Sequence, residues 1–95
     1  PRERETPMAS RTVIVGSSVG LHARPAAIVA EAAGAYDEDI TIRLAGTPED
    51  EGVDAASSLM IMTLGAAAGA EVVVESDDAA AVEAIAALIE RDLDA

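Results

Sequence analysis

Near its C-terminal end the 95-residue chain reads Glu71-Val72-Val73-Val74-Glu75-Ser76-Asp77-Asp78. Three successive β-branched valines favour a strand over residues 71–75 that is buried on both faces or lies at the centre of a sheet. The serine and two aspartates after it have the short polar side chains that cap the start of a helix. An apolar stripe at helical spacing then predicts a long helix to about Leu93, and its members are Val82, Ile85, Ala86, Leu88, Ile89 and Leu93.

Three further strands are predicted upstream of this unit. Residues 12–16 are β-branched and short, and residues 39–44 alternate apolar with polar side chains, so both segments have strand patterns. Residues 46–52 form an acidic, turn-rich loop, and a short strand is expected after it at residues 53–55.

Two further helices separate these strands. Pro25 suits the first turn of a helix, where its missing N–H has no partner to lose, and this helix is expected to end within residues 34–37. Ser57 or Ser58 can cap a shorter helix that continues to about Leu64.

The predicted element order is β-α-β-β-α-β-α. So many alternating short elements in a small chain indicate an α+β fold, in which helices cover one face of an antiparallel sheet. Residues 11–95 form the predicted domain, and residues 1–10, which have no periodicity, are predicted to be a disordered N-terminal extension.

Composition narrows the range of functions. The chain has 18 acidic and 6 basic residues, all of the latter arginine, which gives a formal net charge of −12. Such a field repels nucleic acids and anionic membranes, so neither is an expected partner. The absence of cysteine excludes disulfides, and no apolar run reaches the roughly 18 residues of a membrane span. We therefore expect a cytoplasmic protein that is not inserted in a membrane.

The stretch Gly20-Leu21-His22-Ala23-Arg24-Pro25-Ala26 carries the most chemical information. His22, the only histidine, stands where a helix is about to begin, and the first amides of that helix, at Ala23 and Arg24, lack intrahelical acceptors. These amides, the helix dipole and the Arg24 guanidinium predict a phosphate-binding site beside the imidazole. A single histidine without cysteine is a poor metal site and cannot define a catalytic triad.

This stretch resembles the active-site signature of HPr, the phosphocarrier family of the phosphoenolpyruvate-dependent sugar phosphotransferase system. Residues 54–65 resemble the family's regulatory-serine segment, and the resemblance extends from about Arg11 to the C-terminus. It implies an open-faced β-sandwich, with a four-stranded antiparallel sheet covered on one face by three helices. The implied protein is a monomeric phosphoryl carrier rather than a turnover catalyst, with no cofactor and no metal.

The resemblance also implies roles for individual residues. His22 would carry the phosphoryl group on Nδ1, received from enzyme I and passed to a sugar-specific enzyme IIA, with Arg24 as the active-site arginine. Ser57 would be the target of a regulatory serine kinase, although a helix N-cap is an equally simple interpretation. Leu59 and Met62 would supply apolar surface for docking, in addition to core packing.

An acyl carrier protein is the alternative from another class of function. Its small size and acidic composition agree with this chain, and Ser58 would be the attachment site for phosphopantetheine. Acyl carriers are helical bundles, however, and the β-branched segments near both ends of the chain argue against such a fold.

Overall fold

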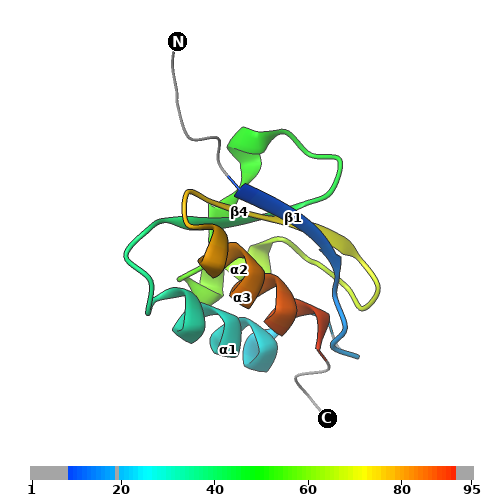
Figure 1. The fold of residues 1–95 in the computed structure, drawn as a ribbon. Coiled ribbons are helices and arrows are strands. Elements are labelled where there is room, and N and C mark those ends of the chain that lie inside the picture. The colour runs from blue at the N-terminus through cyan, green and yellow to red at the C-terminus, as the bar shows by residue number, and fades with distance from the viewer. Residues whose placement is uncertain (1–8, 19, 92–95) are drawn as a thin grey trace.

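The computed structural model describes residues 9–18 and 20–91. Its elements follow the predicted order (Figure 1). They are β1 (Ala9–Ile14), α1 (Ala23–Ala33), β2 (Ile40–Leu44), the 3-10 helix η1 (Glu49–Glu51), β3 (Val53–Asp54), α2 (Ser58–Thr63), β4 (Glu71–Ser76) and α3 (Ala79–Glu90). The predicted α+β class is confirmed.

The four strands form one antiparallel sheet in the order β1-β4-β2-β3. The valine-rich strand β4 is central, because it pairs with β1 on one side and with β2 on the other. Val72 and Val74 are completely buried, and Val73, on the opposite face, is only 8% exposed. The three valines therefore mark the centre of the sheet, as their sequence predicts.

All three helices lie on the same side of the sheet (Figure 1). The core lies between these two layers, where Ile40 and Ile42 of β2 meet Val29 of α1, Ile61 of α2 and Ile85 of α3. A four-stranded sheet is incompatible with a helical bundle, so the acyl carrier alternative with Ser58 as its attachment site is wrong. No helix in the described part of the chain is long and apolar enough to cross a membrane.

The predicted boundaries need correction at both ends of the domain. Ala9 and Ser10, predicted to belong to the N-terminal extension, belong to β1, because they pair with Ser76 and Glu75 of β4. The strand ends at Ile14, two residues before the predicted end. Residues 1–8, which make up the rest of the predicted extension, lie outside the described residues.

The last helix is shorter than predicted. α3 ends at Glu90, and Arg91 has an extended backbone with ψ of 155°, so the helix does not reach Leu93, which itself lies outside the described residues. The carbonyl oxygen of Ile89 accepts a hydrogen bond from the N–H of Gly16 at 2.9 Å. The loop that contains Gly16 thus donates a hydrogen bond to one of the last carbonyl groups of the helix. The local sequence around either residue does not predict this contact.

Candidate functional site

His22 is the N-cap residue of α1. Its backbone is extended, with φ −87° and ψ −165°, and its carbonyl oxygen accepts the N–H of Ala26 at 2.8 Å to close the first turn. The imidazole is exposed and makes no capping hydrogen bond. Within the described residues the ring is therefore available to a ligand or a partner.

The first turn of α1 presents unpaired donors next to this ring. No main-chain acceptor within residues 9–18 and 20–91 pairs with the amides of Ala23 or Arg24. The next residue, Pro25, is buried and has no N–H. The Arg24 side chain is exposed and forms no ion pair with any described carboxylate. Two amides, a guanidinium and the positive end of an 11-residue helix thus belong to the helix start that carries the imidazole, which suits an anion such as phosphate.

The loop that precedes His22 is hydrogen-bonded to the segment that follows α2. Leu21, only 3% exposed, donates its N–H to the carbonyl oxygen of Ala66 at 2.9 Å. Two further main-chain bonds of 2.9 Å join Val15 to the same segment, from Val15 N–H to Ala70 and from Gly69 N–H to Val15. These contacts place the histidine on a rigid support, and the sequence pattern did not reveal them.

Ser57 is the N-cap of α2. Its Oγ accepts the N–H of Met60 at 3.2 Å, and its carbonyl accepts the N–H of Ile61 at 3.0 Å. The preceding turn is closed by Asp54, whose carboxylate accepts the N–H of Ala56 at 2.9 Å. The capping interpretation is confirmed by this geometry, and Ser58 is the first helical residue. The structure also shows that α1 and α2 pack against each other, so the helices of His22 and Ser57 are neighbours.

The apolar residues of α2 divide between core and surface. Leu59 is 69% exposed and Met60 is 42% exposed, whereas Ile61 is fully buried. Met62, expected at the docking surface together with Leu59, is half-buried and packs against the core. Met60 therefore contributes more exposed surface than Met62. Four consecutive apolar residues predict that some of them face solvent, but not which ones.

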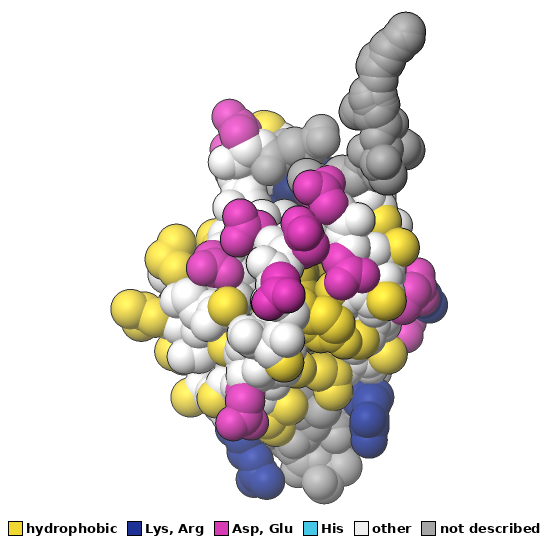
Figure 2. Space-filling view, turned by 60° about the vertical axis from the view of Figure 1, so that its left-hand side comes forward, with side chains coloured by type: hydrophobic (Ala, Val, Ile, Leu, Met, Phe, Trp, Pro, Cys, Tyr) yellow, Lys and Arg dark blue, Asp and Glu magenta, His cyan; other side chains and the backbone are white. Residues whose placement is uncertain are grey.

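Acidic side chains are prominent on one face of the molecule (Figure 2). The face of the molecule in Figure 2 shows acidic side chains around exposed hydrophobic ones, with basic side chains near its lower edge. The described residues contain no group of three or more histidine, cysteine or acidic side chains that could hold a metal ion.

The chain is thus an open-faced α+β sandwich that presents an exposed histidine at a helix N-terminus. The family model described as the phosphorylation site of the HPr component of the phosphotransferase system matches residues 9–91. The chain is 45% identical over 91 residues to the phosphocarrier protein HPr of Streptomyces coelicolor, covering 92% of this chain and 94% of that protein.

Solved structures agree with this assignment. The crystal structure of a phosphocarrier protein HPr from Bacillus anthracis superposes with a TM-score of 0.76 at 33% identity, covering 86% of this chain and 96% of the other. HPr from Thermoanaerobacter tengcongensis gives a TM-score of 0.73 at 30% identity, with 86% and 91% covered. The chain belongs to the HPr family of phosphocarrier proteins of the phosphotransferase system.

Proposed function

We propose that His22 accepts a phosphoryl group from enzyme I, itself charged by phosphoenolpyruvate, and passes it to a sugar-specific enzyme IIA. The observation that carries this proposal is the exposed imidazole at the N-cap of α1, beside the unpaired amides of Ala23 and Arg24. Phosphoenolpyruvate is a cytoplasmic metabolite, so the proposal also places the chain in the cytoplasm.

The transfer is a substitution at phosphorus. A neutral imidazole with its proton on Nε2 offers the lone pair of Nδ1, which forms the new bond to phosphorus. The bond between phosphorus and the donor breaks, and its electron pair stays with the donor. The phosphoryl oxygens then lie where the Ala23 and Arg24 amides and the Arg24 guanidinium can donate hydrogen bonds to them. Transfer to enzyme IIA repeats the same step with His22 as the leaving group.

The chain acts in this scheme as a covalent intermediate rather than as a turnover catalyst. Its contribution is a stable position for the imidazole and a set of donors that does not rearrange during transfer. Each partner must approach the same histidine, and the exposed Leu59 and Met60 offer apolar docking surface on the helix that packs against α1, with Met62 at its edge.

We further propose that Ser57 is a regulatory position for a serine kinase. Its place at a helix start supports this role, because a phosphate there lies at the positive end of the helix dipole. It would also bring about −1.5 to −2 units of charge next to the apolar residues of α2.

The deciding experiment is an intact-mass measurement after incubation with enzyme I and phosphoenolpyruvate. One added phosphoryl group is expected on the wild-type chain and none on His22→Ala. The label should be lost in acid and kept in base, as for a phosphorus–nitrogen bond. A label that survives acid, or that persists in His22→Ala, would show that another side chain carries the phosphate.

A further inference from the structure

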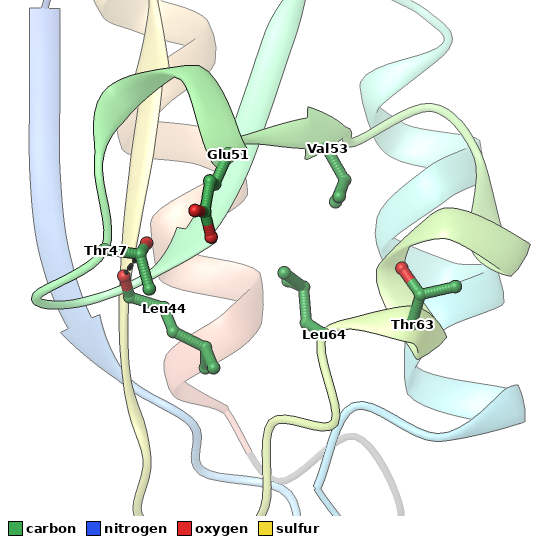
Figure 3. Close-up of a pocket in the computed structure, with 6 residues that line it drawn as sticks. All are labelled: Leu44, Thr47, Glu51, Val53, Thr63 and Leu64. Atoms are coloured by element: carbon green, nitrogen blue, oxygen red, sulfur yellow. Dashed lines mark hydrogen bonds between the residues drawn. The ribbon is translucent and has the colours of Figure 1, made fainter.

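A hollow of about 290 Å³ lies between the end of β2, the η1 segment, β3 and the end of α2 (Figure 3). Its lining residues are Leu44, Thr47, Glu51, Val53, Thr63 and Leu64. The volume is close to the lower limit of small-ligand pockets, roughly 300–1,000 Å³, so the hollow suits a single side chain or a similarly small group. The phosphoryl relay proposed above does not use it.

The wall of the hollow formed by the β2–β3 connection is held in place by hydrogen bonds. Thr47 donates to the carbonyl oxygen of Leu44 twice, from its N–H at 3.2 Å and from its hydroxyl at 2.6 Å. Arg43 donates from Nη1 to the carbonyl oxygen of Thr47 at 2.8 Å, and the N–H of Glu51 bonds to Pro48 at 3.0 Å. The hollow is therefore preformed, which lowers the entropic cost of filling it.

The polar side chains that line the hollow offer acceptors, and the Arg43 guanidinium behind its wall already donates to Thr47 and Glu75. The hydroxyl protons of Thr47 and Thr63 are already donated to the carbonyl oxygens of Leu44 and Met60, which leaves only oxygen lone pairs. The Glu51 carboxylate is exposed and has no hydrogen bond or ion pair within the described part of the chain. Figure 3 shows Glu51, Val53 and Leu64 directed into the same space from three different elements.

The chemistry of the lining residues indicates which kind of side chain the hollow can bind. The apolar sides formed by Leu44, Val53 and Leu64 suit a hydrocarbon stem, and three acceptors without a side-chain donor suit a cationic head that only donates. Arginine has such a stem and a planar head with five donors. The net charge of −12 favours the approach of such a cation.

The hollow is continuous with the exposed surface of α2. Thr63 follows Leu59 by four positions and Leu64 follows Met60 by four, so each pair lies on one side of the helix. A protein seated on Leu59 and Met60 therefore has the mouth of the hollow within one helical turn. We propose that the hollow is a docking pocket for an arginine side chain of a protein partner that binds α2. The inference rests on the proposed function only for the identity of that partner, enzyme I or enzyme IIA.

The pocket itself can be tested without phosphoryl transfer. Acetyl-arginine methylamide is titrated into the isotope-labelled chain, and methyl and amide shifts are followed by NMR. Shifts centred on Leu44, Val53 and Leu64 are expected, with roughly threefold to tenfold weaker binding in Glu51→Gln. The matched control Glu71→Gln removes another exposed carboxylate and should leave the affinity unchanged.

The uncharged analogue acetyl-citrulline methylamide should bind at least threefold more weakly than the arginine probe. Shifts centred elsewhere, equal effects of Glu51→Gln and Glu71→Gln, or equal binding of the citrulline probe would each overturn the arginine pocket. These outcomes do not depend on whether His22 carries phosphate.

The partner is tested by the kinetics of transfer from enzyme I and to enzyme IIA. Glu51→Gln should raise KM about threefold to tenfold for at least one of them and leave kcat unchanged, because the residue is remote from the chemistry. Unchanged KM for both partners would overturn the assignment to these partners even if the arginine probe binds. Absence of any transfer with wild-type protein would instead refute the proposed function.

Discussion

The main-chain oxygen of Ala66 lies 2.4 Å from the point where a Cβ atom on Gly20 would stand. The same oxygen accepts the N–H of Leu21 at 2.9 Å, one residue before His22. Gly20 has φ of +76°, a conformation that glycine adopts without strain. The backbone next to the histidine therefore rests against the segment that follows α2, and only a residue without a side chain permits this approach.

Gly20→Ala should displace His22 and slow its phosphorylation by about tenfold or more, because small misplacements of a reacting group are expensive in rate. The matched control is Gly46→Ala, since Gly46 also has positive φ (+90°) but would place its Cβ in open space. Both variants should lose roughly 1–2 kcal/mol to backbone strain, and Gly20→Ala should lose more, because its Cβ would also meet the main-chain oxygen of Ala66. Transfer rates and the NMR signals of the His22 ring distinguish them, and equal rates in the two variants would contradict the positioning role of Gly20.

Arg24→Ala should slow transfer to or from His22 by about tenfold or more, because charge-assisted hydrogen bonds to phosphate contribute roughly 1.5–3 kcal/mol each. The melting temperature should change little, since the side chain is exposed and makes no ion pair within the described residues. Arg91→Ala, which removes another exposed arginine, controls for net charge. Rates near wild type in both directions would refute a role for Arg24.

Substitutions of Ser57 separate capping from regulation. Ser57→Ala removes the acceptor for the Met60 amide and should lower stability by about 1 kcal/mol while transfer from enzyme I stays normal. Ser57→Asp retains a capping side chain, so its unfolding midpoint should match wild type, but the added charge beside Leu59 should weaken docking and slow transfer. If Ser57→Asp exchanges phosphate as fast as wild type, the serine is only a cap.

A largely buried ion pair links β2 to the central strand. Arg43 Nε lies 3.2 Å from Glu75 Oε1, and the two side chains are only 15% and 10% exposed. Arg43→Met should destabilise the chain by about 2–4 kcal/mol in urea unfolding, because it leaves the Glu75 carboxylate buried without its partner. The double variant Arg43→Met/Glu75→Leu should recover most of this loss, and a double variant no more stable than the single one would contradict the explanation.

Local signals explain why so much of the fold could be predicted. The valines at 72–74 mark the central strand because β-branched side chains suit a buried pleated surface, and Asp78 caps α3 through bonds to the amides of Ala80 and Ala81. The motif around His22 and Pro25 likewise predicts the start of a helix. Each of these features depends on residues that lie within a few positions of one another, so it can be predicted from the sequence alone.

The remaining features depend on contacts between distant segments. The presence of Ala9 in β1 depends on pairing with Ser76, and the end of α3 coincides with the bond from Gly16 to Ile89. The approach of Gly20 to Ala66 and the meeting of Glu51 with Leu64 in one hollow likewise join residues far apart in the chain. Propensity and periodicity determined which elements form and that the single histidine stands at a helix start, because those preferences act locally. The tertiary structure alone decided where α3 ends, how the backbone before His22 is held and which side of α2 stays exposed. These features follow from steric exclusion and hydrogen bonds that exist only once the layers have met.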